Sequence, residues 1–342
     1  MFISDPSITA QYSRATDRLV AASTLSFAVL LLPQILQNSL ALSAGNTAAL
    51  SILSWVGFTT ALLGNTVLLS YFVSRGEAGG ARIQALGALS NAAVLAQVFL
   101  AGHMPTVAAY TLAAIEAVGM SVTLAKVTGM LDGSRVGDNF GKGVWQSYLD
   151  ALGVLGVTVL VQALSMTITG GTATQPGVLA GLGALTFLLL DKLGKLPQNL
   201  QGVWVLVPAW AATFLFGFQP VAQLVSNLRD PTSLAGIAVP SVVLAMVSNA
   251  LMVPRALFTE DAVWFVGSAW GSLMGWAQLL SLCLGTSPSG ARFLAPPIFA
   301  ASTAVFFTYW ALFLRADCKS KGQPGLFNTA AALLLGLANK RV

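Results

Sequence analysis

The chain has 342 residues, of which 56% are hydrophobic and only 8% are charged, and its formal net charge is +5. Soluble domains carry roughly 25% charged residues, so this composition excludes an ordinary soluble protein. The basic residues are scattered over short polar segments, which excludes a nucleic-acid-binding patch as the reason for the positive charge. We therefore predict an all-α integral membrane protein surrounded by the lipid bilayer, with no nucleic acid partner.

Apolar runs long enough to cross a hydrocarbon core of ~30 Å, at ~1.5 Å per residue, recur from end to end. The predicted spans are 19–41, 49–73, 83–102, 105–125, 145–168, 173–190, 202–226, 233–253, 262–284 and 293–314. The sixth span is the weakest prediction because it is short and follows the Gly-rich residues 169–172.

The distribution of basic residues supports ten spans. With this count, fifteen of the 17 Lys and Arg residues fall on one side of the membrane, and only Arg229 and Arg292 fall on the other. Removing the sixth span would scramble this separation. By the positive-inside rule, both termini should face the cytoplasm or its organellar equivalent.

We divide the chain into a polar N-terminal segment, two three-helix repeats separated by three linking helices, a final helix and a tail. The boundaries are 1–18, 19–102, 103–201, 202–284, 285–315 and 316–342. No cleavable leader is expected within the first segment. The apolar part of the tail, 327–337, is too short to span and is expected to be an interfacial or docked helix.

The repeats are recognised by a proline and two amides in an otherwise apolar helix. These residues are Pro33, Gln34 and Asn38 in the first copy and Pro220, Gln223 and Asn227 in the second. The helix after each copy carries a mid-span asparagine, Asn65 or Asn249. The two repeats start six spans apart, an even number, so they run parallel, an arrangement of transporters that bind substrate at the repeat interface. Gene duplication with a packing role only is the alternative.

Pro33-Gln34 with Asn38 resembles the PQ-loop motif of SWEET sugar carriers and lysosomal amino-acid exporters. Longer stretches narrow the resemblance to the maltose-excess-type maltose exporters of the plastid inner envelope. These stretches are 44–51, 62–65, 68–72, 144–146, 219–227 and above all 249–258, followed by Trp264 and Gly267-Ser268. The resemblance covers about residues 25–315 and implies facilitated export of maltose, made by starch breakdown, from the stroma to the cytosol. Together with the positive-inside rule, this location would place both termini in the stroma. The second copy departs from the motif, since Pro220 precedes Gln223 by three residues.

Neutral amides can donate to and accept from sugar hydroxyls, and Trp rings match the apolar faces of sugar rings. The predicted substrate-binding residues are Asn65, Asn249, Asn91, Gln97, Trp55, Trp270 and Gln278, with Trp210 and Trp276 as further aromatic platforms. An amide that bonds a neighbouring helix, or a Trp at the membrane interface, is the alternative for each residue. Maltose and glucose offer the same hydroxyl chemistry, so both remain candidate substrates, and the oligomeric state stays open.

Prolines free backbone carbonyls and bend helices. Pro33 and Pro220 are therefore hypothesised to be gating pivots, with a static kink as the alternative. Glu116 lies in the middle of the fourth span, where a carboxylate signals either proton coupling or a neutral group hydrogen-bonded between helices; we favour the neutral group. Asp150 is expected to be interfacial, and His103 solvated in its loop.

The sequence lacks a ligand cluster, a nucleophile elbow and a phosphate loop, so we expect neither an enzyme nor a resident metal or cofactor. A facilitative sugar carrier is the leading hypothesis. A proton-coupled carrier of another small solute and a PQ-loop sorting receptor are the alternatives, although a receptor would need a charged face on the side where charge is sparse.

Overall fold

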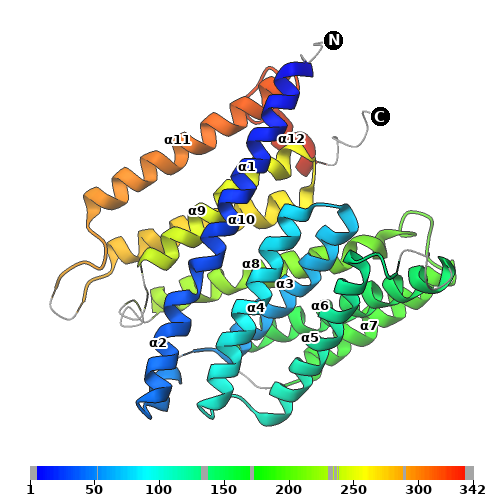
Figure 1. Ribbon diagram of the computed structural model, residues 1–342, viewed down its shortest axis with the longest axis horizontal. Helices are drawn as coiled ribbons and strands as arrows, with labels where there is room; N and C mark the ends of the chain where they lie inside the picture. The colour runs from blue at the N-terminus through cyan, green and yellow to red at the C-terminus, as the bar shows by residue number, and fades with distance from the viewer. Residues whose placement is uncertain are drawn as a thin grey trace. The chain divides into compact units, whose positions relative to one another are not determined.

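The computed structural model describes residues 6–51, 53–131, 138–169, 173–229, 234, 237, 239–287 and 290–335. Within these ranges the regular structure is helical, and one isolated β-bridge joins Thr286 and Arg292 (Figure 1). The α-helices are α1 Pro6–Leu30, α2 Leu32–Ser43, α3 Trp55–Arg75, α4 Ala78–Leu100, α5 Thr106–Val127, α6 Asp138–Thr169, α7 Gln175–Lys192, α8 Val207–Arg229, α9 Val239–Phe258, α10 Ala262–Leu284, α11 Pro296–Ser320 and α12 Asn328–Leu334. Two 3₁₀ turns, η1 Thr47–Leu50 and η2 Val203–Leu206, precede α3 and α8. The predicted all-α class is confirmed.

Each of the ten predicted spans overlaps one helix, or, for the first, the α1–α2 pair. Among the described residues, seven helices are long and apolar enough to cross a membrane. They are Thr9–Ser43, Trp55–Arg75, Ala78–Leu100, Thr106–Val127, Lys142–Thr169, Val239–Phe258 and Pro296–Ser320. α7, α8 and α10 are not among the seven, so the count of ten stays a prediction.

Local chemistry explains where several helices begin and end. The Ser54 side chain accepts from the Gly57 N–H and caps α3, which ends at Gly76 in the left-handed conformation with φ 70°. Asp261 caps α10 in the same way by accepting from the Trp264 N–H. Pro33, which has no N–H to donate, lies in the first turn of α2, where the chain has broken from α1 at Leu31.

The chain forms two compact units, and its boundaries fall at the two proline motifs. Unit 1 comprises Met1–Leu30 and Pro220–Val342, and unit 2 comprises Leu31–Gln219. The chain therefore passes between units just before Pro33 and again at Pro220, inside α8.

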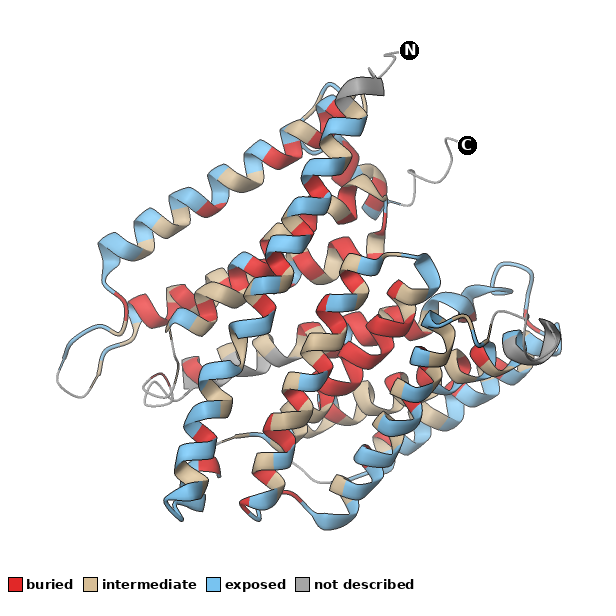
Figure 2. Ribbon diagram, viewed as in Figure 1, coloured by how far each residue is buried: buried red, intermediate tan, exposed pale blue. Residues whose placement is uncertain are grey.

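Unit 2 is organised around α3, which packs along α4 and also touches α5 and α6. Residues Thr60–Ser70 of α3 are all buried, and α3 is largely red in Figure 2. Their apolar neighbours include Val94 and Val98 of α4 and Leu112 of α5. α6 and α7 form an antiparallel pair whose core includes Leu188 and Trp204.

In unit 1, α9 packs against α1 and α10, with further contacts to α11 and α12. Its core includes Val242 and Met246 of α9, Leu279 and Leu282 of α10, and Phe306 of α11. The short α12 lies against α11 and buries Thr329, Ala330 and Leu333, so the described part of the tail is a docked helix. The polar N-terminal segment is helical from Pro6 onward.

Candidate substrate-binding site

Asn65 lies in the buried middle of α3, facing α4. Its side chain is 4% exposed, and its Nδ2 donates to the Ala61 carbonyl at 2.6 Å. A Cβ atom added to Gly87 of α4 would lie less than 3.0 Å from Asn65 Oδ1. Asn91, one turn further along α4, donates from Nδ2 to the Gly87 carbonyl at 2.7 Å. The glycine at position 87 therefore makes room for the amide of Asn65.

Asn249 has the same surroundings in unit 1. Its side chain is also 4% exposed, and its Nδ2 donates to the Ala245 carbonyl at 2.8 Å. A Cβ atom on Gly271 of α10 would lie 2.7 Å from Asn249 Oδ1. Among the described residues this Oδ1 has no hydrogen-bond partner. A buried acceptor without a partner is uncommon in proteins and calls for an explanation.

The two glycines are site residues that our sequence reasoning missed, although a signal for them is present. Gly87 and Gly271 each stand 22 residues after their asparagine. Asn65 and Asn249 thus share the spacing to a glycine, the i−4 hydrogen bond and the close approach of that glycine. The repeats themselves stay a prediction.

The motif amides hold helices together within each unit. Gln34 Nε2 donates to Asn38 Oδ1 at 2.7 Å, and Asn38 Nδ2 donates to Gln97 Oε1 of α4 at 2.9 Å. Gln97 Nε2 in turn donates to the Ile35 carbonyl at 2.9 Å. The structure therefore places Gln97, a predicted substrate ligand, in a network that fastens α2 to α4.

In the second copy, the motif asparagine also donates to a neighbouring helix, but to a serine in place of a glutamine. Asn227 Nδ2 of α8 donates to Ser281 Oγ of α10 at 3.3 Å. Ser281 stands ten residues after Gly271, as Gln97 stands ten after Gly87. Gln278 Nε2 makes a long contact of 3.4 Å to the Pro220 carbonyl. The side chain of Gln223 lies outside the described residues.

The tryptophans predicted to bind the sugar differ in exposure and in the groups that they contact. Trp270 is 42% exposed on α10, and the Trp276 Nε1 donates to Thr303 Oγ1 of α11 at 3.0 Å. Trp210 packs against Phe214, one turn along α8, with ring centroids 5.9 Å apart. Trp55 lines a cavity.

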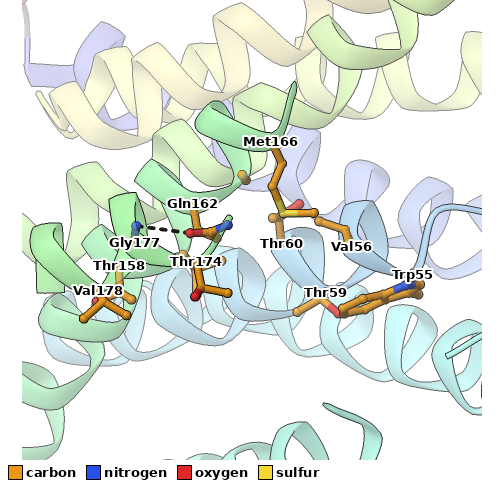
Figure 3. Close-up of a pocket in the computed structure, with 12 residues that line it drawn as sticks. Trp55, Val56, Thr59, Thr60, Thr158, Gln162, Met166, Thr174, Gly177 and Val178 are labelled. Carbon is orange, nitrogen blue, oxygen red and sulfur yellow. Dashed lines mark hydrogen bonds between the residues drawn. The ribbon is translucent and has the colours of Figure 1, made fainter. Parts of the chain in front are cut away.

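This cavity, of about 270 Å³, lies between α3, α6 and α7 in unit 2 (Figure 3). Its wall combines Trp55, Thr59 and Thr60 of α3 with Gln162 and Met166 of α6. Both polar atoms of the Gln162 side chain are already hydrogen-bonded within the protein. Its Oε1 accepts from the Gly177 N–H at 3.1 Å, and its Nε2 donates to the Ala173 carbonyl at 2.8 Å. Asn65 does not line this cavity.

Glu116 contacts the helix of the candidate site. Its Oε2 lies 2.7 Å from Thr66 Oγ1, which also lies 3.1 Å from the Leu62 carbonyl. Thr66 is the donor in both contacts, with Glu116 Oε2 and the Leu62 carbonyl as the acceptors. This contact is compatible with both readings of Glu116, so the protonation state of its carboxyl group stays a prediction.

Two further predictions concern Asp150 and His103. Asp150 is 4% exposed, because it accepts from Trp204 Nε1 at 2.9 Å and Gln146 Nε2 at 3.1 Å and pairs with Lys192. Its interfacial depth in the membrane stays a prediction. His103 lies in its loop, where its Nε2 lies 2.8 Å from the Thr47 carbonyl. Because a carbonyl only accepts, Nε2 carries a proton.

Comparisons with known proteins assign the chain to a protein family. The family model described as the Maltose excess protein 1 N-terminal domain matches residues 7–132. Maltose excess protein 1-like, chloroplastic, from Oryza sativa subsp. japonica is 34% identical over 311 residues, covering 90% of this chain and 75% of that protein. Maltose excess protein 1, chloroplastic, from Arabidopsis thaliana is 32% identical over 324 residues, covering 94% and 74%. No solved structure matches. Because the similarity extends over most of both relatives, the chain belongs to the Maltose excess protein 1 family.

Proposed function

We propose that this protein is a facilitative sugar carrier that moves maltose across the plastid inner envelope. The names of its relatives refer to maltose and the chloroplast. The observation that carries the proposal is the repeated amide: Asn65 and Asn249 lie buried in corresponding positions, each held against a glycine.

The chemistry of these groups suits a neutral, polyhydroxylated substrate. A buried amide is costly in an apolar helix bundle unless its oxygen and nitrogen find partners. Both Nδ2 groups donate to their own helices, which leaves Oδ1 of Asn249 to accept from a sugar hydroxyl. Asn91 supplies a further amide on α4, and Trp55 an aromatic face.

In this proposal the two proline motifs are pivots for alternating access. The chain passes between its compact units at Leu30–Leu31, just before the first motif, and at Gln219–Pro220, within the second. The clamps formed by Asn38 and Asn227 keep the segment after each proline attached to its own unit. Transport that is unchanged in Pro33→Ala would count against the pivot.

The decisive experiment is uptake of radiolabelled maltose into proteoliposomes, with glucose and sucrose as competitors and a proton ionophore present or absent. We expect saturable flux that ignores the ionophore and is lost in Asn65→Ala and in Asn249→Ala. Folded protein that moves no sugar would refute the maltose assignment. Competition by glucose equal to that by maltose would widen the substrate to both sugars.

A further inference from the structure

Pro254 leaves a gap in the hydrogen bonding of α9 directly beside the candidate site. In an α-helix the N–H of residue 254 would donate to the carbonyl of Ala250. Proline has no N–H, and its ring also crowds that carbonyl, which favours a bend in the helix. Ala250 follows Asn249 and is buried, and an unpartnered carbonyl in a membrane interior is costly.

A tyrosine from another helix fills this gap. The hydroxyl of Tyr309 in α11 donates to the Ala250 carbonyl at 3.2 Å. The Tyr309 ring is half-buried against the core of unit 1 and packs on Phe313, with ring centroids 5.2 Å apart. The hydroxyl is thus held by packing that does not depend on the hydrogen bond.

Three neighbouring helices hold three consecutive residues of α9. The Ser248 carbonyl accepts from Ser23 Oγ of α1 at 2.8 Å, in addition to its place in the helix. Asn249 lies against Gly271 of α10, and Ala250 receives Tyr309 of α11. The direction of the Asn249 side chain is therefore set by contacts on both of its neighbours.

The first repeat has no such gap. Ser70 stands five residues after Asn65, where Pro254 stands five after Asn249. A serine keeps its backbone N–H, so α3 continues without a freed carbonyl at this point. Any effect of Tyr309 should therefore act on Asn249 and leave Asn65 unaffected.

We propose that Tyr309 is a positioning residue for substrate binding. Its hydroxyl takes the place of the N–H that Pro254 lacks, fixes the bend of α9 and so directs the amide of Asn249. The proposal rests on the proposed function in one respect, namely that Asn249 contacts the sugar.

The test is Tyr309→Phe made in the wild-type chain and in Pro254→Ala. The Pro254→Ala change restores the ordinary donor to the Ala250 carbonyl, so the tyrosine hydroxyl becomes redundant. In the wild-type chain, we expect Tyr309→Phe to raise the half-saturation concentration for maltose about three- to tenfold, the effect of one lost hydrogen bond. In the Pro254→Ala background, the same change should leave it unaltered. Tyr110→Phe, at a residue of α5 that is 66% exposed, is the matched control and should change neither background.

The outcomes separate positioning from a general loss of structure. A purely structural role would lower the maximal flux per carrier and leave half-saturation unchanged. An equal shift in both backgrounds would overturn the proposal. Should Pro254→Ala fail to fold, Pro254→Ser replaces it as the background, because serine also restores the backbone N–H. An equal shift in half-saturation in that background would likewise overturn the proposal.

Failure of the proposed function can be told apart from failure of this inference. If the wild-type protein moves no maltose, thermal unfolding in detergent decides about Tyr309. If Tyr309→Phe lowers the midpoint temperature of unfolding more in the wild-type chain than in the Pro254→Ala background, the hydrogen bond to the Ala250 carbonyl is supported. An equal decrease of the midpoint temperature in both backgrounds refutes this hydrogen bond.

Discussion

At the scale of single residues, a glycine and an asparagine act as a pair in each half of the protein. Each asparagine occupies the space that a side chain at the glycine would need. A methyl group at Gly87 or Gly271 would meet the amide at less than 3.0 Å, closer than Cβ atoms approach other atoms. The amide would have to turn, or the two helices would have to separate.

Replacing either glycine by alanine should therefore mimic loss of the asparagine. We expect Gly87→Ala and Gly271→Ala to cut maltose uptake at least as strongly as Asn65→Ala and Asn249→Ala. Gly183→Ala in α7 is the matched control, since a Cβ atom there meets nothing within 4 Å, and it should keep full uptake. Uptake close to wild type in both site variants would show that the amide positions are not critical.

Glu116 provides a second prediction at this scale. If its carboxyl group is neutral, a glutamine can replace it, because the amide is also neutral and keeps an oxygen that accepts from the Thr66 hydroxyl. We expect Glu116→Gln to retain maltose uptake and its insensitivity to ionophore. Loss of uphill sugar accumulation in this variant would instead support the proton-coupled alternative.

At the scale of helices, Asp150 joins three elements of unit 2. Its carboxylate lies on α6 and accepts from the indole of Trp204 in η2, while Lys192 at the end of α7 pairs with it. Lys192 is 50% exposed, so the ion pair contributes little by itself. The hydrogen bond from the buried indole contributes more to stability. Without the Asp150 carboxylate, the indole N–H would be buried with no acceptor, and its lost solvation would not be compensated.

Asp150→Ala should therefore lower the free energy of unfolding by about 1–3 kcal/mol. Asp150→Asn keeps an acceptor for Trp204 and should cost less. The measurement is equilibrium denaturation in detergent micelles, followed by tryptophan fluorescence. Equal stability of Asp150→Ala and wild type would remove Asp150 from the contacts that stabilise the α6–α7 pair.

The sequence predicted the positions of the helices better than it predicted which helices pack against one another. Composition and length sufficed for the all-α class, because runs of apolar residues are read directly from the chain. The glycines opposite Asn65 and Asn249 escaped notice because glycine is common here and its role depends on which helix it faces. The roles of Gln97 and Asp150 also depend on partners distant in sequence, Asn38 and Trp204.

At the scale of the whole chain, the boundaries of the compact units differ from those of the predicted repeats. Each unit contains a helical segment that the sequence assigns to the other repeat. α1 lies in unit 1 with α9, although it begins the first repeat, and Val207–Gln219 of α8 lies in unit 2 with α3. The residues before the two asparagines take part in this exchange. A Cβ atom on Gly64 would approach the Ala212 carbonyl of α8 at 3.4 Å, and the Ser248 carbonyl accepts from Ser23 of α1. A boundary drawn along the sequence could not anticipate an exchange made inside continuous spans.

The number of membrane crossings is the remaining prediction at this scale, and α7 decides it. Charge separation requires α7 to span, whereas its length and composition do not place it among the seven candidate spans. Thr174 and Lys195 flank α7, and both are exposed. In a chain with Cys283 and Cys318 replaced by serine, Thr174→Cys and Lys195→Cys should react with a membrane-impermeant maleimide from opposite sides of oriented vesicles. Lys195→Cys should share its side with Lys319→Cys, near the C-terminus. Labelling of residues 174 and 195 from the same side would exclude α7 as a span and, with it, the ten-span topology.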